Sequence, residues 1–373
     1  MEKREIRIIL AGGGTGGHLF PAIALAEEFM GRSPMHKVLF IGTERGLEAR
    51  LLPRLGFALR TITVEGVKGR GPVKMLGSLL KIPRGMAQSF SILREFRPHI
   101  ALGVGGYASG PAVLAAHCMG IKTAIAEQNA LPGTTNRILG RFADRVFLTF
   151  PDRERRFAAE KTVVTGNPVR RAFTEGMIRT GRDERAFSIL VFGGSQGARA
   201  INRAVMEALP YLADMKEALV IVHQTGEREA DEVSAAYRDY GIRAAVHPFI
   251  DDMASAYGAA DLLICRAGAT SIAEITAMGR ASILIPYPFA VGGHQEMNAR
   301  VLADAGAAEM ILEERLDGKT LAGAIRRLVE SPERVRRMEV ASARCGNVKA
   351  ATRIVDECMA LLDGKSMVQT GRI

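Results

Sequence analysis

The stretch IRIILAGGGTGGHLFPAIALAEEF (residues 6–29) joins an apolar run, a glycine-rich turn and a helical pattern. The apolar run at residues 6–11 predicts a buried strand. Pro21 falls in the first turn of the helix, where its missing N–H leaves no hydrogen bond unmade. The expected buried stripe of this helix comprises Leu19, Ile23, Ala26 and Met30. The stretch therefore predicts a strand, a tight turn and a helix, which is the repeating unit of a doubly wound parallel sheet.

The same pattern returns in the second half of the chain, at SILVFGGSQGARAINRAVMEAL (residues 188–209). Other strands are expected at 37–42, 99–106 and 122–128, and then at 218–226, 244–250, within 260–279 and at 281–289. The repetition predicts an α/β protein with two Rossmann-like domains in tandem and a border in the polar stretch 165–185. A closing helix is expected where Val348, Ala351, Ile354 and Met359 recur at roughly helical spacing.

Composition narrows the class of protein. The chain has 373 residues, of which 47% are hydrophobic and 24% charged, as in a soluble globular protein of two ordinary domains. Its net charge of +10 favours anionic partners, although a basic soluble enzyme without such partners has the same charge. Four scattered cysteines and the absence of a signal peptide predict free thiols in a reducing cytoplasm, with no metal site. No apolar run approaches the roughly 20 residues of a membrane span, so any membrane contact is expected to be peripheral.

The first glycine-rich turn spells G-x-G-x-x-G, which is a dinucleotide fingerprint when an acidic residue closes the second strand. Here that strand ends at Gly42, and Glu44 follows only two residues later. The misplaced acid argues against an NAD site. The chain also lacks the G-x-x-x-x-G-K-[ST] pattern of a phosphate-binding P-loop.

The second half contains two turns suited to a diphosphate. FGGSQGAR (residues 192–199) precedes a helix, whose N-terminal amides favour an anion, and Ser195 adds a hydroxyl donor. RAGATSIAE (residues 266–274) has small residues that allow a phosphate to approach the backbone, and Glu274 follows at a distance suited to ribose hydroxyls. Either turn alone is equally consistent with a structural role, but the two together favour a nucleotide. Because the chain lacks D-x-D, helix N-termini and backbone amides are expected to stabilise a leaving diphosphate without a metal.

Eight motifs occur in an order that is specific to one family: GGGTGGH, GVGGY, EQNALPGTTNR, TGNPVR, FGGSQGAR, FIDDM, CRAGATSIAE and GGHQEMNA. In this series the chain resembles the MurG family of UDP-N-acetylglucosamine–undecaprenyl-diphospho-muramoylpentapeptide N-acetylglucosaminyltransferases. The resemblance covers essentially the whole chain. One departure is Ala126, because the family often has histidine before the EQN motif.

The resemblance implies a GT-B fold, in which two Rossmann-like domains face a cleft. Residues 1–168 would form the acceptor and membrane-facing domain, with residues 348–373 packing back on it, and residues 169–347 would bind UDP-GlcNAc. The implied reaction, which needs no cofactor, transfers GlcNAc with inversion from UDP-GlcNAc to the C4 hydroxyl of lipid I. The product is lipid II, made for peptidoglycan at the cytoplasmic face of the inner membrane. Another GT-B enzyme that uses a UDP-sugar, such as a UDP-GlcNAc 2-epimerase, is the alternative, against which GGGTGGH with GGSQGAR argues.

The resemblance also assigns residues to the two substrates. For the donor, Ile250 would meet the uracil through its backbone, Glu274 would bind the ribose, Arg170 would lie beside the nucleotide and Gln295 would reach the sugar. The diphosphate would be held by Ser195, Ala269, Thr270 and Ser271. The transferred sugar and the acceptor would be surrounded by Thr15, Gly16, Gly17 and Asn129.

On this interpretation the first glycine-rich loop faces the acceptor, and its amides suit the acceptor's diphosphate. A single inverting displacement needs a base on the acceptor hydroxyl, and the imidazole of His18 is suited to that role near neutral pH. Glu127 is the rival base. A third possibility is that His18 only orients the loop.

The basic segment at residues 67–86 mixes apolar and cationic side chains. Leu79, Leu80 and Ile82, with Lys81 and Arg84 beside them, are expected to contact an anionic membrane surface, where each cation contributes about 1 kcal/mol. A helix packed on the core with solvated lysines is the alternative. Nucleic acid is not an expected partner, because no basic motif interleaved with aromatic residues occurs.

Overall fold

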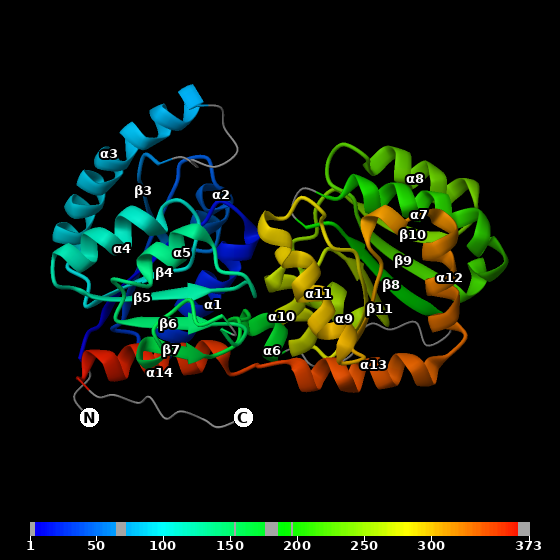
Figure 1. Cartoon of the computed structure of the whole chain (residues 1–373). Coiled ribbons are helices and arrows are strands. Elements are labelled where there is room, and N and C mark those ends of the chain that lie inside the picture. The colour runs from blue at the N-terminus through cyan, green and yellow to red at the C-terminus, as the bar shows by residue number, and fades with distance from the viewer. Residues whose placement is uncertain (1–3, 65–71, 153, 176–185, 195–196, 365–373) are drawn as a thin grey trace. The chain divides into compact units, whose positions relative to one another are not determined.

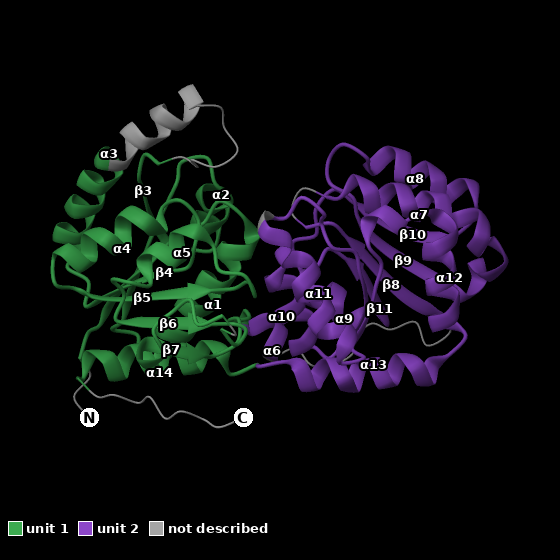
Figure 2. Ribbon diagram, viewed as in Figure 1, with its two compact units in different colours: residues 1–170, 348–373 green, residues 171–347 purple. Residues whose placement is uncertain are grey.

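The chain folds into two units, each built on its own parallel sheet with helices on both faces (Figures 1 and 2). The computed structural model describes residues 4–64, 72–152, 154–175, 186–194 and 197–364, and for residues 72–82, 175 and 291 it describes the backbone only. The first unit comprises residues 1–170 and 348–373, and the second comprises residues 171–347. Val169 and Arg170 therefore belong to the first unit, two residues past the border expected at residue 168.

The first unit contains a seven-stranded sheet with the order β3-β2-β1-β4-β5-β6-β7. Its strands are β1 (Arg7–Ala11), β2 (Lys37–Gly42), β3 (Ala58–Thr61), β4 (Ile100–Gly103), β5 (Lys122–Glu127), β6 (Arg145–Leu148) and β7 (Thr162–Val164). All neighbouring pairs are parallel, as the sequence predicts from its alternation of strands and helices.

The helices of the first unit cover the sheet in two layers. They are α1 (Gly16–Arg32), α2 (Leu47–Arg54), α3 (Pro72–Phe96), α4 (Ser109–Cys118), α5 (Thr134–Leu139), the short η1 (Ala159–Lys161) and α14 (Ala350–Leu362). Alternate residues of β1 point to opposite faces, so Ile8 and Leu10 pack with α1 and α14, whereas Ile9 packs with α3 and α4. Both faces of the sheet are thereby buried.

The expected buried stripe of α1 is confirmed at Leu19, Ile23 and Ala26 and is wrong at Met30, which is 46% exposed. Phe29, three positions after Ala26, is buried instead and packs its ring 5.1 Å from that of His36. Near the end of the helix the buried face therefore follows the i+3 spacing and not the i+4 spacing.

The second unit contains a six-stranded parallel sheet with the order β10-β9-β8-β11-β12-β13. Its strands are β8 (Phe187–Phe192), β9 (Leu219–Gln224), β10 (Arg243–His247), β11 (Leu262–Cys265), β12 (Ala281–Leu284) and β13 (Ala308–Met310). Its helices are α6 (Arg171–Glu175), α7 (Arg199–Leu212), η2 (Ala213–Ala218), α8 (Ala230–Asp239), α9 (Met253–Ala259), α10 (Ala269–Ala277), η3 (Val291–Gly293), α11 (His294–Asp304), η4 (Glu313–Arg315), α12 (Gly318–Val329) and α13 (Pro332–Cys345).

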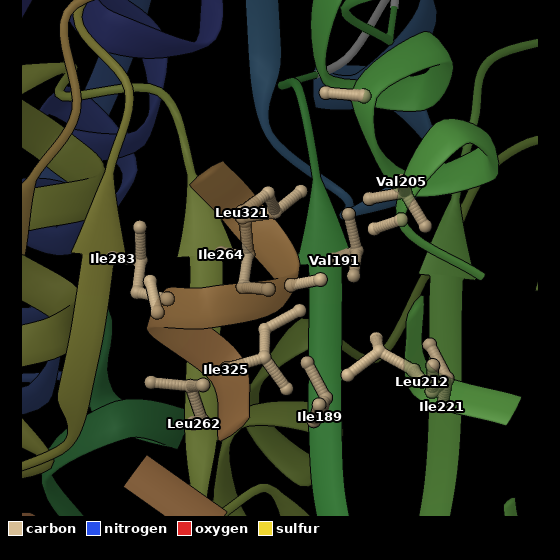
Figure 3. Packing of buried hydrophobic residues seen from close by; sticks show 14 of the residues in the cluster. Ile189, Val191, Val205, Leu212, Ile221, Leu262, Ile264, Ile283, Leu321 and Ile325 are labelled. Carbon is tan, nitrogen blue, oxygen red and sulfur yellow. The ribbon is translucent and has the colours of Figure 1, made fainter. Parts of the chain in front are cut away.

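The main core of the second unit lies between its sheet and helices α7 and α12. Figure 3 shows Ile189 and Val191 of β8 pointing from the sheet toward Ile325 of α12 and its neighbours. The β-branched residues of the strands suit a pleated, buried surface, and the leucine-rich helices close over them. This face of the sheet is thereby removed from water.

Helix α14 returns the end of the chain to the first unit, after the second unit is complete. Ile354, Val355 and Cys358 are buried in the core shared with α1. Arg32 of α1 donates hydrogen bonds to the Asp356 carboxylate (2.6 Å) and to the Thr352 carbonyl (3.0 Å). The expected closing helix is thus present, but Val348 precedes it and is 43% exposed.

Candidate functional site

In open parallel sheets, ligands bind beyond the carboxyl ends of the strands, at the point where the strand order reverses. That point lies between β1 and β4 in the first sheet and between β8 and β11 in the second. The loops that follow these four strands contain the glycine-rich motifs of the sequence.

The glycine-rich loop after β1 uses its own amides inside the first unit. Gly12, Gly13 and Gly14 all have positive φ angles, of 149°, 136° and 89°. Their N–H groups donate to the Ile41 carbonyl (3.0 Å), the Gly105 carbonyl (3.3 Å) and the Glu48 carboxylate (2.7 Å), respectively. The expectation that the amides of this loop suit an anion is therefore wrong for these three, because protein acceptors already take them.

Glu48 is a residue that sequence reasoning missed. Its side chain is buried and also accepts hydrogen bonds from the Thr43 N–H and hydroxyl, both at 2.9 Å. A Cβ atom at Gly13 would lie 2.5 Å from its carboxyl carbon, so glycine is needed there. The carboxylate places negative charge under the loop and disfavours a second anion beside these amides. Glu48 lies in the first turn of α2, four residues after the Glu44 singled out in the sequence.

The loops after β1 and β4 lie in direct contact with each other. A Cβ atom at Gly12 would lie 2.2 Å from the Gly105 carbonyl oxygen, and one at Gly106 would lie 2.4 Å from the Gly13 carbonyl oxygen. At the point where the strand order of the first sheet reverses, the backbones of these two loops therefore pack directly against each other.

The predicted residues Thr15, Gly16, Gly17 and His18 lie together at the start of α1. Thr15 is the N-cap residue, and its carbonyl accepts a hydrogen bond from the His18 N–H at 3.2 Å. The half-buried His18 ring reaches β5's end, where its Nδ1 lies 3.2 Å from the Gln128 Oε1. The structure thus brings His18 to the EQN motif, 110 positions along the chain.

Glu127, at the end of β5, is a buried anchor for the loop that follows it. Its Oε1 accepts from the Asn129 N–H (3.0 Å) and the Asn129 side-chain amide (3.3 Å). Its Oε2 accepts from the Gly133 N–H and the Asn136 side-chain amide, both at 2.9 Å. Four donors occupy the acceptor sites of this carboxylate, and the arrangement favours His18 over Glu127 as a base.

Arg170, expected beside the nucleotide, ends the first segment of the first unit. Its guanidinium carbon lies 4.1 Å from the centre of the Phe20 ring on α1, which is a cation–π contact. The contact places Arg170 near the helix that begins with the first glycine-rich loop.

In the second unit, the turn after β8 requires glycine for close packing. Gly197 has a φ of 74°, and a Cβ atom there would lie 1.9 Å from the Thr225 carbonyl oxygen. Gln224, at the end of β9, donates to the Gly194 carbonyl and accepts from the Ile250 N–H, both at 2.9 Å. Gln224 therefore ties this turn to the loop after β10, and it leaves only the Ile250 carbonyl for a backbone contact to a base. Ser195 lies outside the described residues.

The turn after β11 leads into α10, which presents the other predicted donor residues. Ala269 and Thr270 are buried in the first turn of the helix, and Ser271 is half-buried. Glu274 follows on the same helix, is 6% exposed, and lies 3.5 Å from the hydroxyl of Tyr257 on α9. Hydrogen bonds to a buried carboxylate are charge-assisted and therefore stronger than those between neutral groups.

Gln295 lies in the first turn of α11, which makes one hydrogen bond to the loop after β12 and one to the turn after β11. Its Oε1 accepts from the Tyr287 N–H at 3.0 Å, and Asn298 on the same helix donates to the Ala267 carbonyl at 3.3 Å. The predicted residues of the second unit, except Ser195, thus lie on the loops and helices that follow strands β10 to β12.

A buried polar chain supports the turn after β8 from behind. Tyr237 contacts the His223 Nδ1 (3.0 Å), the His223 Nε2 contacts the Asn202 Oδ1 (3.1 Å), and the Asn202 amide donates to the Thr225 carbonyl (2.9 Å). Burial lowers the pKa of His223 from its ordinary 6.5 to about 3. A neutral ring can accept from the Tyr237 hydroxyl and donate to Asn202, and the chain is then fully satisfied.

This burial predicts that the second unit loses stability in mild acid. The unfolded chain binds a proton at His223 below pH 6.5, whereas the folded chain does so only near pH 3. Stability is therefore full above 6.5 and falls as the pH drops, by about 2 kcal/mol between pH 7 and pH 5. Hydrogen exchange of α7 and β9 measures this loss, and His223→Gln, which cannot titrate, should remove it. An equal pH dependence in both proteins would contradict the prediction.

Among the described residues, no group of three or more His, Cys, Asp or Glu side chains is placed to hold a metal ion. In the same part of the chain, no helix combines the length and the apolar character needed to cross a bilayer. The side chains of Leu79, Leu80, Lys81 and Ile82 lie outside the described residues, and the exposed Arg84 follows them on α3.

Comparisons with known proteins agree with the two-unit fold. Residues 8–148 match the glycosyltransferase family 28 N-terminal domain, and residues 188–357 match the glycosyltransferase family 28 C-terminal domain. A UDP-N-acetylglucosamine–N-acetylmuramyl-(pentapeptide) pyrophosphoryl-undecaprenol N-acetylglucosamine transferase of Syntrophus aciditrophicus is 58% identical over 357 residues, which cover 96% of this chain and 99% of that relative. A relative of the same name from Citrifermentans bemidjiense is 52% identical, over 94% of this chain and 98% of its own length.

Solved structures give the same result. The crystal structure of Acinetobacter baumannii MurG is 32% identical, with a TM-score of 0.75 and coverage of 96% of this chain and 99% of that one. The UDP-GlcNAc 2-epimerase from Neisseria meningitidis, bound to UDP-GlcNAc, has a TM-score of 0.64 and covers 95% of this chain and 100% of that one. Its identity is only 12%, so it shares the fold alone.

Proposed function

The chain belongs to the family 28 glycosyltransferases and, among them, to the MurG family, and from this premise we propose that it transfers GlcNAc from UDP-GlcNAc to undecaprenyl-pyrophosphoryl-MurNAc-pentapeptide, giving lipid II. The reaction is a step of peptidoglycan synthesis. The departure at Ala126 does not weaken the assignment of a base, because a histidine is available at His18.

The assignment of substrates to units is supported by the engaged amides of the first glycine-rich loop and by the two turns of the second unit that suit a diphosphate. In the first sheet, the amides of Gly12, Gly13 and Gly14 are engaged and Glu48 adds negative charge. In the second sheet, the turns after β8 and β11 lead directly into α7 and α10, whose N-termini favour a diphosphate. This supports UDP-GlcNAc binding on the second unit, with Glu274 at the ribose, and acceptor binding by the first unit.

The proposed step is a single inverting displacement. The C4 hydroxyl oxygen of MurNAc attacks C1 of GlcNAc, the bond from C1 to the diphosphate oxygen breaks, and UDP leaves with that electron pair. His18 accepts the hydroxyl proton at Nε2. The amides and dipoles of α7 and α10 stabilise the charge that develops on the leaving diphosphate.

Radiolabelled UDP-GlcNAc and a lipid I analogue test this function. The expected result is a labelled lipid product that appears at the same rate with and without excess chelator. An epimerase would instead convert UDP-GlcNAc to its 2-epimer without an acceptor, and that outcome would contradict the proposal. A loss of transfer that Mg²⁺ restores would contradict stabilisation of the leaving group by helix termini alone.

We also propose that the segment at residues 67–86 holds the enzyme at the inner face of the cytoplasmic membrane, where its lipid-linked acceptor is found. Changing Leu79, Leu80 and Ile82 to serine is expected to weaken binding to anionic vesicles by about tenfold or more, because the variant inserts fewer apolar carbon atoms into the lipid. Cosedimentation with vesicles measures the change, and turnover of a short-chain soluble acceptor should be spared.

Serine at the exposed positions Met30, Val340 and Val348 is the matched control, because it removes three apolar side chains elsewhere. Its vesicle binding should equal that of the wild type. If the membrane variant binds vesicles normally while its melting temperature collapses, the segment belongs to the core and the proposal is wrong.

A further inference from the structure

We propose that Gln128 is a positioning residue that holds His18 with its proton on Nδ1 and its lone pair on Nε2. The inference rests on the proposed role of His18 as the base. A neutral imidazole carries one N–H, so only one of its two tautomers presents Nε2 as an acceptor. The environment of Nδ1 decides which tautomer forms.

The orientation of the Gln128 amide is fixed by its other end. The side chain is 2% exposed, and its Nε2 donates to the Ala126 carbonyl at 3.2 Å. An NH₂ group is required there, because a carbonyl oxygen only accepts. The amide oxygen must then be the atom 3.2 Å from the His18 Nδ1. A carboxamide oxygen cannot donate, so Nδ1 carries the hydrogen and Nε2 is left to accept a proton.

The ring has little room to turn away from this bond. A Cβ atom at Gly105, which has a φ of 90°, would lie 2.6 Å from the His18 Nδ1 and 2.7 Å from its Cε1. The edge of the imidazole that carries Nδ1 therefore rests against the backbone of the loop after β4. Gly105 and Gln128 both lie beside the Nδ1 atom of the ring and restrict its rotation.

The support behind Gln128 is itself well anchored. The Ala126 carbonyl at the end of β5 also accepts from the Asn136 amide at 3.1 Å, and Asn136 is buried. An amide serves here in the place that a carboxylate takes in many catalytic dyads. The neutral amide fixes the tautomer but, unlike a carboxylate, adds no negative charge that would stabilise the imidazolium. His18 can therefore release its proton after each turnover.

Gln128→Met tests the inference, because it keeps the length of the side chain and removes its acceptor. We expect kcat to fall by about ten- to a hundredfold, as the ring loses its tautomer, while UDP affinity measured by calorimetry stays the same. Gln88→Met is the matched control: Gln88, also in the first unit, accepts from the Thr63 N–H at 2.7 Å and donates to the Thr63 hydroxyl at 3.3 Å. Its kcat should be normal.

Gln128→Glu restores the acceptor and adds charge. We expect it to recover part of the lost kcat and to move the acid limb of the pH–rate profile to higher pH, since a carboxylate stabilises the imidazolium. The other carboxylates that anchor these loops, Glu48 and Glu127, are unchanged in every variant and cannot cause the difference. If Gln128 only supported the fold, Gln128→Glu would not shift the pH–rate profile.

A double variant separates the two proposals. In a His18→Ala background, Gln128→Met should cause no further loss of kcat, because its effect passes through the ring. Normal kcat and pH profile in Gln128→Met, with low kcat in His18→Ala, would overturn the role of Gln128 and keep the base. Normal kcat in His18→Ala would overturn the base itself. A fall in UDP affinity or melting temperature that accounts for the whole effect of Gln128→Met would also overturn the inference.

Discussion

Replacing His18 by alanine is expected to lower kcat by about a hundredfold or more, with UDP affinity unchanged. A positioned base contributes about 10²- to 10⁴-fold by removing the acceptor's proton as the new bond forms. The half-buried ring at the start of α1 is held for this task by Gln128 and Gly105. Steady-state kinetics with a lipid I analogue measure kcat, and calorimetry with UDP measures donor affinity.

His117 provides a matched control for this substitution. It lies in the last turn of α4 in the same unit, at the opposite end of that helix from the loop after β4, and its ring centre is 5.5 Å from that of Phe142. His117→Ala should therefore keep its kcat. A His18→Ala enzyme with normal kcat would pass the role of base to another residue, in spite of the four donors that occupy Glu127.

Glu274→Ala is expected to weaken UDP binding by about ten- to a hundredfold. The carboxylate is buried on α10, and we expect its loss to remove the two charge-assisted hydrogen bonds proposed to the ribose, worth roughly 1.5–3 kcal/mol. Calorimetry with UDP measures the change directly, without the acceptor. Melting temperatures should be compared alongside, because a buried side chain is being removed.

Tyr257→Phe is the control for the structural part of this effect. It removes the hydroxyl that lies 3.5 Å from the Glu274 carboxylate and leaves the carboxylate in place. UDP affinity should then stay within a few fold of the wild type. If His18→Ala lost UDP and Glu274→Ala kept it, the nucleotide would belong to the first glycine-rich loop, and the assignment of substrates to units would be reversed.

The fold was largely predictable from the sequence, because strand and helix periods alternate so regularly. The last four residues of β1, β2 and β8 and all of β11 are apolar or glycine and buried, and such runs leave little choice of structure. The strand β10 is different, because most of its residues are exposed at the sheet edge. Strand ends were less predictable: the expected ranges 99–106, 244–250 and 281–289 extended past the ends of β4, β10 and β12. Met30 was expected to be buried, but near the C-terminal end of α1 the side of the helix that packs against the core is the one that carries Phe29.

The site was less predictable, because its geometry depends on partners that are distant in sequence. A glycine-rich motif does not reveal that its amides are already taken by Glu48 or by the loop around Gly105. Gln128 and Gln224 were passed over for a similar reason. An amide has no charge or metal affinity to mark it, and its importance comes only from the two groups it joins.

The return of α14 to the first unit bears on how the protein is made on the ribosome. Until residues 350–362 emerge, the face of the first sheet that carries Ile8 and Leu10 lacks the helix that completes its cover. The second unit is continuous in the chain and needs no such late arrival. During synthesis, the domain that begins first is therefore the one that is finished last, and a nascent chain halted before residue 350 exposes apolar surface that chaperones bind.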